Sequence, residues 1–148
     1  MADVTPTITP AGFYGTSLDL SGATIGATEN GDWVQLGGDL EPTALLLEFT
    51  KDGLTDVDFL AQVRYPGDDT TVFSLMNYIG EATGITFTAS VNVCVPVNVT
   101  TTFDPGDPGA SLCLLGLSEI RVRATTTGTA DTGDVLKATV IGKNHGRI

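Results

Sequence analysis

Hydrophobic and polar residues alternate along most of this chain, which is the pattern of a half-buried β-strand. Val, Ile, Phe and Thr fill many of these positions, and such residues favour a pleated sheet over a helix. The spacing predicts about nine or ten short strands and an all-β fold. The clearest alternating stretches are 44–49, 58–65, 85–99, 120–125 and 136–140.

The stretch that begins at Ile85 is too long for one ordinary strand, and Pro96 within it cannot donate a hydrogen bond to a sheet. We therefore predict a strand that ends near Cys94, a bend or bulge at Pro96, and a second strand that continues to Phe103. We expect such a strand either to cross from one sheet to the other or to project as an arm.

Turn signals separate the predicted strands. Each combines Gly with Pro, Asn or Asp, which are the residues that tight turns require. Two segments also carry weak helix signals, at 55–58 and 72–79, but their composition favours strands, and we predict strands for both. The turn signals lie at Glu29–Asp32, Asp52–Gly53, Tyr65–Asp68, Gly80 and Asp104–Gly109.

These elements predict one antiparallel β-sandwich or barrel over residues 13–142, with a bend or projecting excursion near 95–110. Residues 1–12 contain two Thr-Pro pairs and no periodicity, so we expect an extended N-terminal arm. Residues 143–148 are polar and basic, and we expect a short C-terminal tail.

Composition narrows the possible functions. The 148 residues include 18 acidic and 7 basic side chains, so the net charge is -11. That balance opposes binding to nucleic acid or to an anionic membrane, because both depend on Lys and Arg. With 41% hydrophobic residues and only 17% charged ones, the chain has enough apolar surface to fold. It shows no signal-peptide pattern at its start, so we expect synthesis in the cytoplasm, with Cys94 and Cys113 reduced.

The residues that carry most enzyme chemistry are scarce. His145 is the single histidine and lies in the predicted tail, where nothing would orient it as a general base. We expect no catalytic residue and no cofactor. We expect no metal site either. Clustered aspartates are the best candidates for Ca²⁺, but their spacing is not that of an EF-hand, and Asp-Gly and Asp-Pro-Gly are first of all turn formers. These candidates are Asp52, Asp56, Asp58, Asp104 and Asp107.

Four segments, taken in order, resemble a recurring type of β-sandwich protein from tailed-bacteriophage virions. They are Gly31–Leu36, Thr43–Thr50, Thr55–Thr71 and Glu119–Thr129. Proteins of this type coat capsids as decoration or accessory proteins. The resemblance covers about two-thirds of the chain, and the long Val91–Pro108 segment departs from it.

The resemblance implies a β-sandwich or jelly-roll, no enzymatic activity, and usually trimers on capsid symmetry axes. The expected function is therefore an outer capsid decoration or cement protein, made in the host cytoplasm. Its expected partners are the major capsid protein and further copies of itself. The candidate interface residues are Trp33, Asn92, Asn98 and Phe103.

Three alternatives remain open on the sequence. The chain is also compatible with a tail-tube or tail-fibre subunit. A second alternative is a carbohydrate-binding module that uses Trp33 and an aspartate loop holding Ca²⁺. A third is a hydrolase with paired aspartates, which nothing in the spacing favours.

Overall fold

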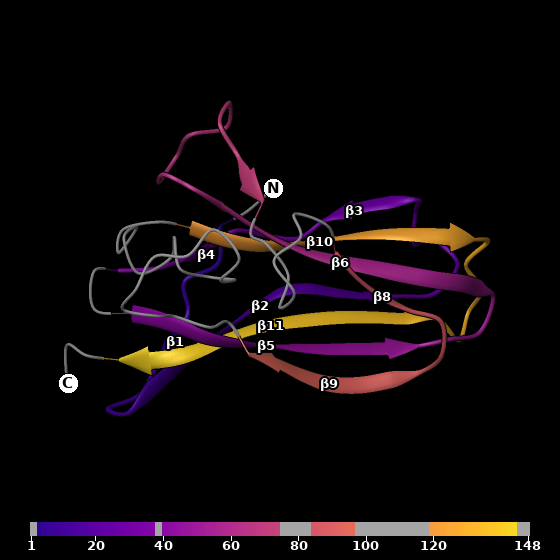
Figure 1. Ribbon diagram of the computed structural model, residues 1–148, viewed down its shortest axis with the longest axis horizontal. Helices are drawn as coiled ribbons and strands as arrows, with labels where there is room; N and C mark the ends of the chain where they lie inside the picture. The colour runs from indigo at the N-terminus through magenta and orange to yellow at the C-terminus, as the bar shows by residue number, and fades with distance from the viewer. Residues whose placement is uncertain (1–2, 38–39, 75–83, 97–118, 145–148) are drawn as a thin grey trace.

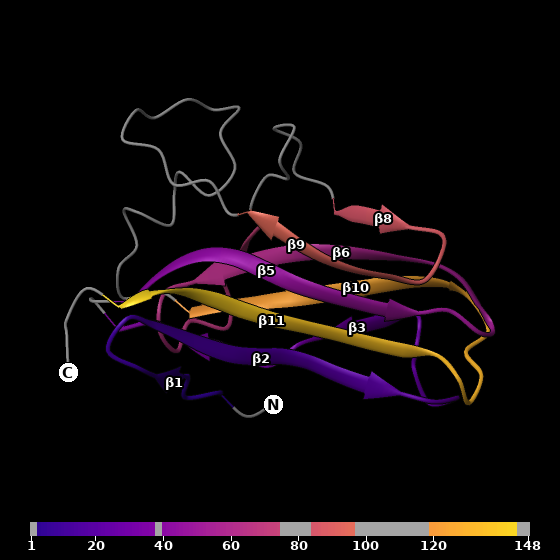
Figure 2. The ribbon, with the colours of Figure 1, turned by 90° about the horizontal axis from the view of Figure 1, so that it is seen from below.

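Two antiparallel sheets face each other and form a β-sandwich (Figures 1 and 2). The computed structural model describes residues 3–37, 40–74, 84–96 and 119–144. All regular elements in these ranges are strands, and no helix there is long and apolar enough to cross a membrane. The predicted all-β sandwich is confirmed, while its jelly-roll connectivity stays a prediction.

The first sheet contains five strands, which Figure 2 shows side by side. All of its neighbouring strands are antiparallel. In spatial order the strands are β1 (Thr7–Ile8), β2 (Gly12–Ser21), β11 (Val135–Asn144), β5 (Leu40–Thr50) and β9 (Val91–Pro96).

The second sheet is built around two long strands, β6 (Leu54–Arg64) and β10 (Glu119–Gly128), which pair over almost their whole length. On the free side of β10 lie β3 (Thr28–Asn30) and β4 (Val34–Gln35). On the free side of β6 lie β7 (Phe73–Ser74) and β8 (Ile85–Phe87).

The core fills the space between the sheets with alternate residues of the long strands. Because successive side chains of a strand point to opposite faces, one face of each sheet is apolar and packs against the other. The buried residues include Leu45, Leu47, Phe49, Leu136, Ala138 and Val140 from the first sheet, and Val57, Phe59, Val63, Ile120, Val122 and Ala124 from the second.

Two connections cross between the sheets at the same end of the sandwich, on the right in Figure 1. One joins β5 to β6 and the other joins β10 to β11. The carboxylate of Asp134, fully buried, ties them together. It accepts the backbone N–H groups of Asp52, Gly53 and Leu54 from the first connection, at 2.6–3.3 Å, and that of Asp131 from the second, at 2.7 Å.

These bonds decide the charge state of Asp134. Burial by itself raises the pKa of the carboxyl group, because it penalises the charged form. The backbone N–H groups favour the charged form and outweigh burial, so the pKa lies below its ordinary value of 3.8. Asp134 is therefore a buried anion neutralised by four amide dipoles, without a cationic partner among the described residues.

A buried hydroxyl makes a second tie between the sheets. The Ser17 side chain of β2 donates to the carbonyl of Asp32 at 2.9 Å and accepts from the N–H of Val122, in β10, at 2.9 Å. Gly31 passes so close that a Cβ built on it would lie 2.2 Å from the Ser17 hydroxyl. A glycine is therefore required at Gly31 for this approach.

The sequence prediction for Ile85–Phe103 needs correction. The chain does cross between the sheets there, but at residues 88–90 and not at Pro96, because β8 pairs with β6 and β9 pairs with β5. Residues 97–103 lie outside the described residues. Of the strand predicted around 72–79, only Phe73–Ser74 is a strand in the described part.

Of two predicted turns, one is confirmed and one is wrong at its start. The turn at Tyr65–Asp68 is confirmed: the N–H of Asp68 donates to the carbonyl of Tyr65 at 3.0 Å, and Gly67 has a φ of 75°. The turn predicted at Glu29–Asp32 is wrong at its start, since Glu29 and Asn30 belong to β3. The pairing of β3 with β10 outweighs the local turn preference of Asn.

Residues 4–8 pair with strands of their own chain, and the extended N-terminal arm over residues 1–12 stays a prediction. Val4 bridges Val34 in parallel, its N–H donates to the carbonyl of Trp33 at 2.6 Å, and Thr7–Ile8 forms β1 beside β2. Residues 4–8 therefore contact both sheets in turn.

We predict that Asp134→Asn lowers the free energy of unfolding by about 2–4 kcal/mol, because an amide cannot accept all four buried N–H groups. Urea denaturation measures the change. Asp19→Asn removes the same charge from an exposed position and serves as the control. Equal stability of the two variants would contradict the role of Asp134.

The lowered pKa also predicts a dependence on pH. A carboxyl group with a lowered pKa in the folded state stabilises the fold fully above its unfolded pKa, and this contribution is lost as the pH falls through the folded value. The stability difference between the wild type and Asp134→Asn should be constant near neutrality and shrink once the pH falls below 3.8. Urea denaturation from pH 7 to pH 2 measures it.

Candidate functional site

A charged cluster lies at the other end of the sandwich, where β6 ends at Arg64. The Arg64 side chain is only 6% exposed, and Arg64 pairs in register with Glu119 of β10. Burying a guanidinium is costly unless carboxylates and hydrogen bonds surround it. The sequence supplies these partners from three separate segments.

Three carboxylates contact the guanidinium of Arg64. Asp3 lies 3.3 Å from one terminal nitrogen, Asp69 contacts the other, and Glu119 lies 3.4 Å from Nε. Glu119 is itself buried, with a side chain 3% exposed, and its Oε1 accepts the N–H of Gly67 at 2.8 Å. Its other oxygen has no hydrogen-bond donor among the described residues. The cluster therefore holds a buried ion pair between the two central strands.

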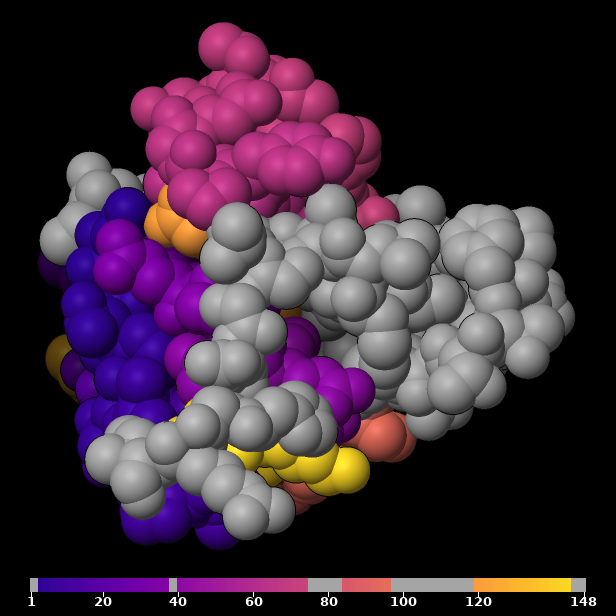
Figure 3. All heavy atoms as spheres, turned by 90° about the vertical axis from the view of Figure 1, so that its left-hand side faces the viewer, coloured from indigo at the N-terminus to yellow at the C-terminus, as the bar shows by residue number. Residues whose placement is uncertain are grey.

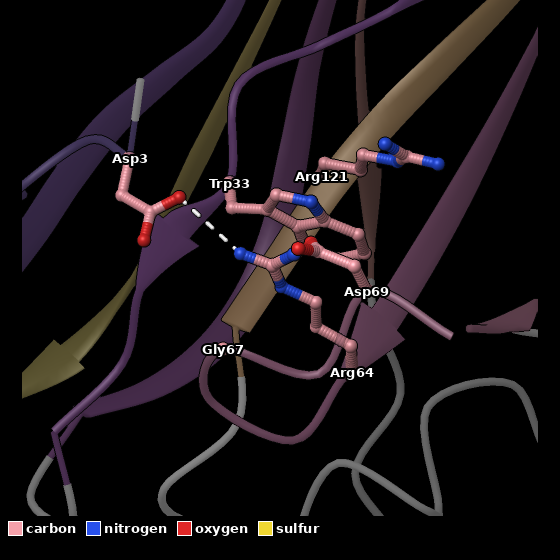
Figure 4. A pocket seen from close by; sticks show the side chains of 6 residues that line it. All are labelled: Asp3, Trp33, Arg64, Gly67, Asp69 and Arg121. Carbon is pink, nitrogen blue, oxygen red and sulfur yellow. Dashed lines mark hydrogen bonds and ion pairs between the residues drawn. The ribbon is translucent and has the colours of Figure 1, made fainter. Parts of the chain in front are cut away.

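Trp33 lies against two arginines. The guanidinium carbons of Arg64 and Arg121 are 4.4 Å and 4.5 Å from its ring centre, which is the distance of cation–π contacts (Figure 4). Trp33 is only 4% exposed. Its ring therefore supports the arginines and offers no open platform to a sugar.

Arg121 and Arg123 of β10 extend the cluster. Among the described residues, their positive charges lack the carboxylate partners that Arg64 has. Arg121 donates through Nε to Gln62 at 2.9 Å. Burial, followed by the charges of Arg64 and Arg123, lowers the pKa of Arg121. The three carboxylates thus gather at Arg64, while positive charge remains along β10.

An open hollow of about 520 Å³ lies in front of this cluster. Its walls are mostly polar and include both positive and negative side chains, which Figure 4 shows around the ring of Trp33. The lining residues are Asp3, Trp33, Arg64, Gly67, Asp69 and Arg121.

The hairpin beside the hollow is held by its own hydrogen bonds. Asp68 accepts the N–H groups of Thr70 and Thr71 and the hydroxyl of Thr70, and these bonds lower its pKa. The connection from β6 to β7 stands out from the sandwich (Figures 1 and 3). At its base Tyr65 and Phe73 meet edge to face and are about half exposed.

The predicted interface residues are dispersed. Trp33 lies in the charged cluster, whereas Asn92 is exposed on β9 in the other sheet. Asn98 and Phe103 lie outside the described residues. Cys94 is exposed and free on β9, while Cys113 also lies outside the described part.

The structure does not bring the described calcium candidates together. Asp52 accepts the N–H of Gly133, and Asp58 accepts the hydroxyl of Thr86. Asp56 pairs in register with Thr127. In the described ranges no three His, Cys, Asp or Glu side chains are grouped so that they could hold a metal ion. Asp104 and Asp107 fall outside those ranges.

Arg64, Arg121 and Glu119 were not predicted as site residues from the sequence. A signal was available, because Arg121 and Arg123 alternate with apolar residues in a strand of an acidic protein. The pairing of Glu119 with Arg64, 55 positions earlier, and the contact of Arg64 with Asp3 depend on the fold.

The chain matches no protein-family model, no curated protein and no solved structure.

We predict that Arg64→Met destabilises the protein by about 3–5 kcal/mol, because it leaves Glu119 buried without its cation. The double variant with Glu119→Gln should recover roughly half of that loss, since the buried charge is then absent. Urea denaturation of the two single variants and the double variant gives the coupling free energy between Arg64 and Glu119. A double variant whose loss equals the sum of the single losses would show that the two side chains do not interact.

Proposed function

We propose that this protein is a non-enzymatic structural component of a tailed-bacteriophage virion, bound on the outer capsid as a decoration or cement protein. The proposal begins from the four segments that resemble such proteins. Three of them supply β4, β6 and β10, which lie side by side in one sheet. The fourth supplies most of β5, in the facing sheet.

The three segments meet at the hollow, and this observation supports the proposal most strongly. Trp33 comes from the first, Arg64, Gly67 and Asp69 from the second, and Arg121 from the third; with Asp3 they line the hollow. The residues behind the resemblance therefore build one surface site at one end of the sandwich. Arginine is enriched in interfaces, and here the buried ring of Trp33 supports Arg121 at the hollow, which favours a binding site.

The charges indicate what this site contacts. Arg121 lines the hollow without an ion pair to any described carboxylate, although Asp69 lies close enough to favour its charge, in a protein with a net charge of -11. An acidic side chain of the capsid protein would neutralise it and would be guided there against the general repulsion of an acidic surface. We propose that the hollow faces the capsid and that Arg121 binds a carboxylate of the capsid protein.

The first test determines whether the virion contains this protein and in what amount. Mass spectrometry of purified virions of the encoding phage should find the protein in stoichiometric amount with the heads. Purified protein should also sediment with heads from which it has been removed. Its presence on isolated tails alone would favour the tail-subunit alternative and contradict the capsid position.

The second test addresses the hollow. Arg121→Gln should weaken co-sedimentation with depleted heads by about tenfold, because a charge-assisted contact is lost. Lys51→Gln removes the same charge from an exposed residue near the opposite end and should bind like the wild type. Equal binding by both variants would contradict the assignment of this face to the capsid.

A further inference from the structure

The outward face of the five-stranded sheet is organised in rows that the strand register defines. Residues directly opposite one another in neighbouring strands share a face. In this sheet the side chains of alternate positions, such as Leu47, Ala138 and Val140, fill the core. The residues between them therefore face away from the other sheet, and Figure 2 views these strands from that side.

One row across β2, β11, β5 and β9 is charged. It consists of Asp19, Lys137, Glu48 and Asn92. Lys137 and Glu48 are 4.0 Å apart and their side chains are 39% and 44% exposed, so solvent still reaches both. This pair lies on the two central strands of the row.

The next two rows carry no charge. Tyr14, at one side, is 51% exposed, and Cys94, at the other, is exposed, whereas Thr139 and Ala44 on the two central strands are buried. Beyond these rows, the register places a second lysine–glutamate pair, Lys143 opposite Glu41. An uncharged centre with charged margins is the composition of a protein interface. The two uncharged rows are Thr16, Thr139, Leu46 and Cys94, then Tyr14, Ile141, Ala44 and Pro96.

The order of charges is self-complementary. A twofold axis parallel to the strands, between β11 and β5, places β11 over β5 of a second copy. Lys137 then lies over Glu48 of the partner subunit, and Glu48 over Lys137 of the partner subunit. The same operation places Lys143 over Glu41 of the partner subunit. Each lysine–glutamate row therefore forms two attractive contacts between the two copies, although both copies have the same sequence.

The shape of the face agrees with this arrangement. A hollow of about 400 Å³ lies beside Glu48 between β5 and β9. The twofold operation brings the strands β2 and β11 of the partner subunit over it, so the long side chain of Lys137 of the partner subunit has a space to enter. The hollow is lined by Leu46, Leu47, Glu48, Asn92, Val93 and Cys94.

We propose that this face binds a second copy of the same chain, with the two sheets packed face to face about a twofold axis. The three rows cover roughly 400 Å² of sheet, given the usual spacings of strands and residues. A standard interface buries about 800 Å² on each partner, so we expect this pair to be weak. Pairing does not depend on the proposed function, because it needs no capsid. It differs from the trimer that the resemblance implies, which requires two different patches.

A charge exchange tests the proposal. Sedimentation equilibrium from about 10 µM to 1 mM should show a monomer–dimer equilibrium for the wild type. Lys137→Glu should raise the dissociation constant by about tenfold, because it places glutamates opposite each other. The double variant Lys137→Glu/Glu48→Lys exchanges the charges within each copy and should restore the wild-type value.

Lys51→Glu is the matched control, because it makes the same change in net charge at an exposed residue outside the face. Thermal melts verify that all variants are folded. A monomer throughout the concentration range, a trimer, or an equal effect of Lys137→Glu and Lys51→Glu would overturn the proposal. Failure of the double variant to restore pairing would overturn it as well, since the twofold arrangement requires that result.

Discussion

The fold depends on a buried carboxylate that joins two crossings of the chain. Each connection between the sheets, from β5 to β6 and from β10 to β11, leaves backbone N–H groups without strand partners, and buried amides must be satisfied. Asp134 satisfies four of them at once. Hydrogen bonds to a charged acceptor are stronger than those to a neutral one, and here they also hold the acceptor in its charged form. Both sheets are therefore fixed relative to each other at this end, and Ser17 fixes them again further along.

The rigid sandwich holds two further sets of side chains in place. One lies at its other end and one on the outward face of the five-stranded sheet. Arg64 brings three carboxylates to the far end, where the hollow opens, and Arg121 retains a positive charge beside it. The outward face of the five-stranded sheet instead has uncharged rows between lysine–glutamate pairs. Two surfaces with different chemistry are thus available, one proposed for a capsid and one for a second copy. This separation lets a protein bind a scaffold and its own kind at the same time.

The sequence predicted the fold well where the hydrophobic period is regular. The alternation in 44–49, 58–65, 120–125 and 136–140 corresponds to β5, β6, β10 and β11. The strand β2 was not predicted, because a bulge opposite Ala138 and Thr139 shifts its alternation at Ser17. The charged cluster was missed for another reason. Arg64, Glu119 and Asp3 are far apart in sequence, and a buried ion pair leaves no local pattern.

We expect Asp134 to make the two crossings part of the cooperative core of the protein. Native-state hydrogen exchange tests it directly on the amides of Gly53, Leu54 and Asp131. They lie in or beside connections between strands, where amides usually exchange by local opening. We expect these amides to exchange only by global unfolding, as slowly as the amide of Val122 in the central strand β10. Exchange at the rate of exposed turn amides, while Val122 remains protected, would contradict it.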